Sequence, residues 1–169
     1  AGQCNQAGLQ NTFIGFGAGQ ISGCSVGSDD AKSNVAVGYE AGKNVRGCCN
    51  ISIGLKAGHD SLSNPSLGCA NILMGAYTGT NLCTGNQNTF IGSCAGKDTT
   101  IGSFNFFGGY KAAEGNIGGA CNVYIGNQVG YAATGGEQNI ALGQKSTYNN
   151  STGSYNISFG TCASYSLTS

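Results

Sequence analysis

The chain has 169 residues and a formal net charge of zero; only 8% of its residues are charged, whereas 40% are hydrophobic. The acidic and basic residues stand singly, so the sequence has neither the basic stripe of a nucleic-acid-binding protein nor a polybasic membrane patch. It also contains no stretch of about 18 apolar residues, which a membrane-spanning helix would require. Glycine accounts for 31 residues, but the apolar residues recur at regular intervals, which favours a folded repeat over a disordered linker.

One short phrase recurs along the chain: an asparagine, a short apolar run, a glycine, and then small residues. Clear copies begin at Asn11, Asn34, Asn50, Asn71, Asn88, Asn122, Asn139 and Asn156, and a degenerate copy, FNFFGGYKA, begins at Phe104. The glycines that end the apolar runs are 23, 16, 21, 17, 16, 18, 17 and 17 residues apart, so the period is near 17. Short apolar runs between Asn and Gly are typical of strands, and only stacking gives such strands a core. The sequence therefore predicts an all-β fold, a single parallel β-solenoid domain over residues 1–169 with about nine rungs.

The apolar residues of each copy predict which face of the strands is buried. Counting the first residue of each copy as position 1, position 4 is always apolar and position 2 mostly so, whereas position 3 is mixed. Because side chains alternate across a strand, we expect positions 2 and 4 to face the core and position 3 to face outward. A charge at Ile91 is then expected to be disruptive, and a charge at Ser52 to be tolerated. The aromatic residues at the outward position are candidate subunit contacts: Phe13, Phe90, Phe106 and Tyr124.

Two further columns of the repeat fit a solenoid. The asparagines at position 1 would stack on one another, and their side-chain amides would hydrogen-bond along the stack. The glycines at position 5 suit a bend that requires a positive φ or leaves no room for a Cβ.

The repeat phrase resembles that of a known family. NVAVGYEAG from Asn34 and NIALGQKST from Asn139 closely resemble the head repeats of trimeric autotransporter adhesins, and related Asn-x-x-Ile-Gly-x-x-Ala-Gly arrays occur in bacterial surface proteins and phage tail fibres. The resemblance covers about residues 11–163. It implies a parallel β-roll, exposure at a surface, and often a trimer whose heads adhere to a host.

Nine cysteines are a high count for this length: Cys4, Cys24, Cys48, Cys49, Cys69, Cys83, Cys94, Cys121 and Cys162. They lack the CxxC or Cys/His spacing of a metal site, so we predict no metal or cofactor, and instead disulfides formed in an oxidising compartment. Cys48 and Cys69 both lie two residues before the asparagine of a rung, so stacking would bring them within bridging distance; Cys49 or Cys24 would compete for the same partner. Cys4 and Cys162 belong to the first and last turns, too far apart to join within one molecule, and are candidates for a bridge between subunits.

Other chemistry has weaker support in the sequence. Segments such as IGFGAG fit the hexapeptide of left-handed β-helix acyltransferases, but those enzymes run hexapeptides in tandem and use a catalytic histidine. The one histidine here, His59, lies in a loop beside Asp60. We therefore predict no catalytic residue and no enzymatic activity. An ice-binding solenoid would need a regular array of threonine on its outward face, which position 3 lacks.

Asn149 and Asn150 head overlapping glycosylation sequons in a polar turn and are the candidate acceptors if the source glycosylates its secreted proteins.

We predict a structural, non-enzymatic protomer of a secreted extracellular fibre. Neither end of the repeat shows a polar cap, so we expect subunits to meet head to tail as a homopolymer. The alternative is an adhesin head or phage tail-fibre segment, on a cell or virion surface, that binds a host protein or glycan.

Overall fold

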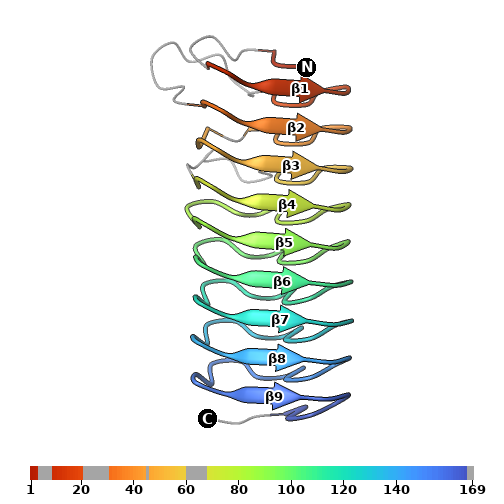
Figure 1. Ribbon diagram of the computed structural model, residues 1–169, viewed down its shortest axis with the longest axis vertical. Helices are drawn as coiled ribbons and strands as arrows, with labels where there is room; N and C mark the ends of the chain where they lie inside the picture. The colour runs from red at the N-terminus through yellow and green to blue at the C-terminus, as the bar shows by residue number, and fades with distance from the viewer. Residues whose placement is uncertain (4–8, 21–30, 45, 60–67, 167–169) are drawn as a thin grey trace.

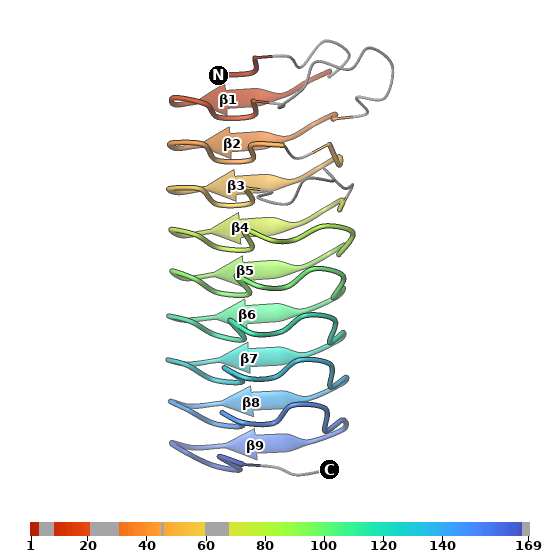
Figure 2. The same ribbon diagram turned by 180° about the vertical axis from the view of Figure 1, so that it is seen from behind.

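Nine short strands stack in chain order to form one parallel sheet that runs the length of a rod (Figure 1). They are β1 (Thr12–Ile14), β2 (Val35–Val37), β3 (Ile51–Ile53), β4 (Ile72–Met74), β5 (Thr89–Ile91), β6 (Phe106–Gly108), β7 (Val123–Ile125), β8 (Ile140–Leu142) and β9 (Ile157–Phe159). The structure is a computed structural model, which describes residues 1–3, 9–20, 31–44, 46–59 and 68–166. Viewed from behind, the connecting turns are stacked in the same register as the strands (Figure 2). The predicted all-β parallel solenoid is confirmed.

The strand register corrects the start of the sixth rung. Strand β5 pairs with β6 so that Phe90 lies opposite Phe107, one residue later than the sequence phrase suggested. The sixth rung therefore begins at Asn105 and not at Phe104, which places Phe106 at position 2. With this correction position 1 is asparagine in all nine rungs, and the position-5 glycines are 17 residues apart from Gly75 to Gly160.

The predicted assignment of the two strand faces is wrong. Position 3 is the buried position: Ala36, Ser52, Leu73, Phe90, Phe107, Tyr124, Ala141 and Ser158 are all buried, and only Phe13 in β1 is half-buried. Side chains at positions 2 and 4 are half-buried or exposed, and Ile91 keeps 42% of its surface exposed. A charge at Ser52 is thus expected to be disruptive and one at Ile91 to be tolerated, the reverse of the expectation from the sequence.

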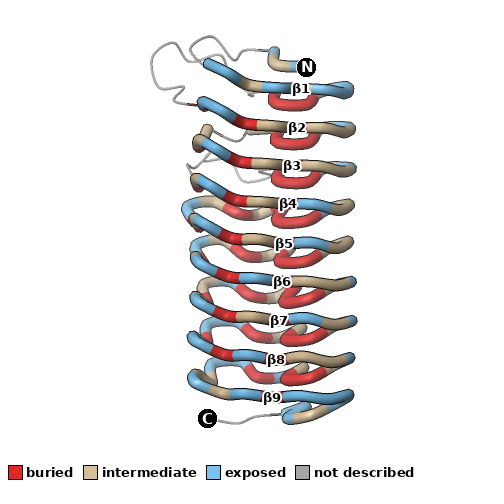
Figure 3. The backbone as a smooth tube through the Cα atoms, in the orientation of Figure 1, coloured by how far each residue is buried: buried red, intermediate tan, exposed pale blue. Residues whose placement is uncertain are grey.

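The turns leave room for the side chains at position 3. Behind most strands the chain presents a buried residue and then a glycine, such as Ala95 and Gly96 behind Phe90. A Cβ on Gly96 would lie 2.5 Å from the Phe90 ring, so the missing side chain makes room for the ring. The interior is therefore narrow, and its buried residues form columns that repeat from coil to coil (Figure 3).

The asparagines of position 1 form the continuous ladder that the sequence predicted. Each Oδ1 accepts the backbone N–H of the asparagine in the next rung at 2.8–3.0 Å, in every step from Asn11 to Asn156. The Nδ2 of each asparagine from Asn34 to Asn139 donates to a glycine carbonyl later in its own coil, as in Asn88 to Gly102 at 2.8 Å. One buried side chain thus closes its own coil and joins it to the next. Satisfying these buried groups is essential, because an orphaned one costs about 1–3 kcal/mol.

The position-5 glycines are required for two reasons, as predicted. Gly92 has φ +132°, a conformation that residues with a side chain rarely adopt. A Cβ there would also lie 2.4 Å from the carbonyl oxygen of Gly109 in the next rung. The close approach of the stacked backbones therefore excludes any other residue.

Candidate functional site: the outer face of the sheet

Positions 2 and 4 of the nine strands form one exposed apolar surface, which we call the outer face. Position 2 contributes Thr12, Val35, Ile51, Ile72, Thr89, Phe106, Val123, Ile140 and Ile157, and position 4 contributes Ile14, Val37, Ile53, Met74, Ile91, Gly108, Ile125, Leu142 and Phe159. Among these described positions, two side chains are polar, both of them threonine, and no side chain is charged. Exposure is greatest in the first and last strands, where Ile14 is 59% and Ile157 is 68% exposed. A continuous apolar surface of this kind typically marks a site of association.

The described charged residues lie in the turns, away from the outer face. The clearest group surrounds Glu40, whose carboxylate accepts a hydrogen bond from Lys43 at 2.6 Å and lies 3.4 Å from the Lys56 ammonium. The hydrogen bond from Lys43 lowers the pKa of Glu40 below its usual value. Burial lowers the pKa of His59 and outweighs the opposing pull of Glu40, 3.9 Å away. His59 is therefore a neutral side chain at pH 7, and Asp60 lies outside the described residues.

An open groove of about 290 Å³ adjoins His59. Its lining is polar and aromatic: Lys56, His59, Tyr77, Thr80, Asn81, Lys97 and Asp98. Asn81 donates a hydrogen bond to the Asp98 carboxylate at 3.0 Å, so the Asn81 amide and the Asp98 carboxylate bind each other. The described residues include no group of three or more His, Cys, Asp or Glu side chains that could hold a metal ion. The groove can thus offer hydrogen bonds and an aromatic surface to a polar ligand.

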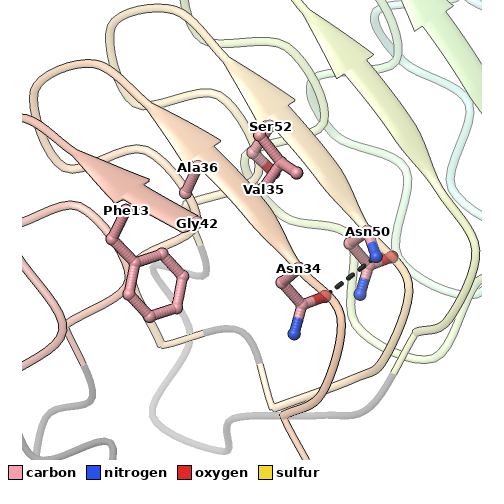
Figure 4. Close-up of a pocket in the computed structure, with 7 residues that line it drawn as sticks. All are labelled: Phe13, Asn34, Val35, Ala36, Gly42, Asn50 and Ser52. Atoms are coloured by element: carbon pink, nitrogen blue, oxygen red, sulfur yellow. Dashed lines mark hydrogen bonds between the residues drawn. The ribbon is translucent and has the colours of Figure 1, made fainter. Parts of the chain in front are cut away.

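An interior gap among the described residues is much smaller. Between β1 and β3 the position-3 side chain changes from Phe13 to Ala36 and Ser52, which leaves a small gap beside the asparagine ladder (Figure 4). Its volume of about 10 Å³ is roughly that of one water molecule.

Only one of the four aromatic residues predicted as subunit contacts lies on the outer face. Phe90 and Tyr124 are fully buried, and Phe13 is half-buried against Ala18, Ala36 and Ala41. Phe106 is 38% exposed, but at position 2 and not at the predicted position 3. The aliphatic residues at positions 2 and 4 were missed as surface residues because they had been assigned to the core. The available signal was that all three strand positions are largely apolar, which is typical of a sheet covered on both faces.

Stacking brings one predicted cysteine pair together. The Sγ atoms of Cys48 and Cys69 lie 2.9 Å apart, and the Cys48 backbone N–H donates to the Cys69 Sγ at 3.1 Å. Burial, followed by the hydrogen bond with Cys48, raises the pKa of the Cys69 thiol. The described cysteines form no disulfide bond.

The other predicted cysteine sites are dispersed. Cys49, Cys121 and Cys162 are exposed, whereas Cys83 and Cys94 are half-buried. Cys4 and Cys24 lie outside the described residues, so the structure does not place the predicted Cys4–Cys162 contact between subunits.

The two candidate glycosylation sites differ in access. Asn150 is fully buried; its Oδ1 accepts the Gly153 N–H at 2.9 Å and its Nδ2 donates to the Gly153 carbonyl at 3.1 Å. Asn149 is exposed, and its side chain makes one long contact, 3.4 Å, with the Ser166 hydroxyl. Asn149 is therefore the accessible acceptor of the two.

The chain matches no protein-family model, no curated protein and no solved structure. Among the described residues no helix is long and apolar enough to cross a membrane.

Proposed function

We propose that the chain is a structural, non-enzymatic protomer of a secreted extracellular fibre, in which rods stack head to tail. The observation that carries this proposal is the constancy of the contact between rungs. In every step the position-2 N–H donates to the position-1 carbonyl of the next rung at 2.8 Å, from Thr12 to Asn34 through Ile140 to Asn156. A contact that repeats by translation is satisfied equally by a rung of the same chain or of another copy, and such a heterologous contact generates a filament.

The last strand presents the donor that another rung would use. Ile157 occupies position 2 of β9, and its N–H has no acceptor among the described residues. Exposed strand edges of this kind are templates for pairing with a further strand. The proposed stacking therefore continues the sheet across the junction between two copies.

A single substitution tests this junction. Ile157→Pro removes the N–H aimed at the next rung, and proline is tolerated on an edge strand. Ile157→Ala is the matched control, because it also shortens the side chain but keeps the donor. We expect light scattering to show chains of rods with Ile157→Ala and single rods with Ile157→Pro. Equal assembly of the two variants would contradict head-to-tail stacking.

Secretion is supported by the cysteine content, since closely placed cysteine pairs persist as disulfides in oxidising compartments. We propose that Cys48 and Cys69 become a disulfide there, with each thiol losing a proton and an electron to a disulfide oxidant. The bond would join the β3 and β4 rungs. The chain from Asn50 to Asn71 is 21 residues long, whereas the other coils from β2 onward have 16 or 17 residues, so the bond would fasten the longest of these coils.

The alternative function is an adhesin head or phage tail-fibre segment that binds a host glycan or protein. The groove beside His59 favours it, because its lining combines the aromatic ring of Tyr77 with the charged side chain of Lys97. Glycan-array binding that is lost in Tyr77→Ala and kept in Tyr39→Ala, a tyrosine outside the groove, would support this alternative. An array without signal would leave the structural role as the better account.

A further inference from the structure

We infer that the outer face is an interface at which a second copy of this chain packs sheet to sheet. This inference goes beyond the proposed stacking, because end contacts lengthen a rod whereas face contacts join two rods side by side. It starts from the exposure of the strands: Ile14, Ile91, Ile125 and Ile157 each leave 39–68% of their surface in contact with water.

The sequence of the strands is that of a sheet covered on both faces. Parallel sheets occur almost only with both faces buried, and their strands are apolar at every position, whereas half-exposed sheets alternate apolar with polar residues. In this chain the turns cover the inner face, where Phe107 and Tyr124 are fully buried. The outer face is nevertheless as apolar as the inner one, since strands such as VAV, VYI and IAL are apolar at all of their positions. Within the part of the chain that the structure describes, only the inner face is therefore covered.

The geometry of the outer face suits a second copy of itself. Its two columns of side chains repeat with the strand spacing over β1 to β9, so an identical face offers the same spacing to interdigitate with. The charges that would set the orientation of a different partner are absent from these described positions; Lys43, Lys56 and Glu40 lie in the turns. Two such sheets would pack about 10 Å apart.

The area is sufficient for a specific dimer. Nine strands at ~4.8 Å, each with two outward side chains, cover a strip of roughly 40 by 15 Å. Two copies would then remove on the order of 1,200 Å² from water, at the lower end of the range for specific interfaces. Because most of this area is aliphatic, association would be insensitive to salt.

A charge placed in the middle of the outer face tests the inference. We would replace Ile91 and Ile125 by glutamate together, in the Ile157→Pro background, which blocks stacking at the end and alters the outer face only in its last strand. The matched control is the pair Ile101→Glu and Ile117→Glu, since these isoleucines are 61% and 51% exposed but lie in the turns. Sedimentation equilibrium would give the mass of each variant, and circular dichroism would show that each is folded.

We expect the background chain to sediment with twice the mass of one 16.9 kDa chain. The strand pair of glutamates should weaken association roughly tenfold or more, and the turn pair should leave it unchanged. The milder pair Ile91→Thr and Ile125→Thr, which keeps β propensity, should weaken it less and covers the case in which glutamate unfolds the strands. A background chain that stays monomeric, or that associates equally with either glutamate pair, would overturn the inference. Because Ile157→Pro and Ile157→Ala are compared separately, failure here is distinguishable from failure of head-to-tail stacking.

Discussion

The ring of Phe107 lies 4.6 Å from the ring of Phe90 in the preceding rung, and the two planes differ by only 8°. The ring of Tyr124 continues the column at 5.5 Å from Phe107. Position 3 therefore supplies the bulk of the core in the middle of the rod, and positions 2 and 4 supply its outer surface.

Neighbouring residues of β5 should differ sharply in their contribution to stability. Phe90→Ala should lower the free energy of unfolding by about 3–5 kcal/mol, because it leaves a cavity between Leu73 and Phe107. Ile91→Ala should cost less than about 1 kcal/mol, because that side chain is already 42% exposed. Denaturant unfolding followed by circular dichroism measures both. Equal losses would show that the strand faces are assigned wrongly here too.

The asparagine ladder should be sensitive to a single deletion. Asn105→Ala would orphan the buried backbone N–H of Asn122 and would remove one of two amide donors to the Gly119 carbonyl, which keeps the hydrogen bond from Asn116. One orphaned group costs about 1–3 kcal/mol, so we expect a loss of about 2 kcal/mol in the free energy of unfolding. Asn149→Ala removes the same amide from an exposed turn and should have almost no effect. If the two substitutions prove equivalent in thermal unfolding, the ladder does not stabilise the stack.

The positions of the repeat that require one particular residue type could be predicted from the sequence. The asparagine of position 1 and the glycine of position 5 each serve a contact that no other residue provides, so both recur visibly and reveal the period and the solenoid. Register then follows, and it correctly places Cys48 next to Cys69. These features are local consequences of stacking and need no knowledge of the rest of the coil.

The buried face could not be predicted from hydrophobicity, because both faces of the sheet are apolar. The decisive constraint is the space behind each strand, where Gly96 and Gly130 face the rings of Phe90 and Tyr124, and Gly42 faces Ala36. A further indication of the buried position depends on where the sixth copy begins. If it begins at Asn105 instead of Phe104, the asparagine column is complete and Phe107 takes the same position as Phe90.

The thiols of Cys48 and Cys69 should be linked after oxidation. Peptide mapping of the protein, alkylated without reduction after exposure to oxidised glutathione, should recover these two residues in one linked peptide. Cys121, which is exposed and has no described thiol at such a distance, should be alkylated under the same conditions. Recovery of Cys48 and Cys69 as separate alkylated peptides would reject the disulfide.

Tyr124 should make the fold sensitive to alkaline pH. Desolvation raises its pKa to about 12, and the buried hydroxyl has no hydrogen-bond partner among the described residues. A raised pKa means that the folded state favours the neutral phenol, so the stabilisation is complete below the ordinary value near 10 and is lost as pH rises toward 12. The shift corresponds to about 2–3 kcal/mol. Tyr124→Phe should abolish that part of the decline, as measured by unfolding at a series of alkaline pH values; an unchanged decline would show that other groups cause it.

The most direct test of a fibre-forming role is the distribution of particle lengths in electron micrographs of the purified chain. Nine strands at ~4.8 Å make each rod roughly 40 Å long. We expect unbranched particles whose lengths are multiples of that value and increase with protein concentration. A single particle length of one rod at every concentration would contradict that role.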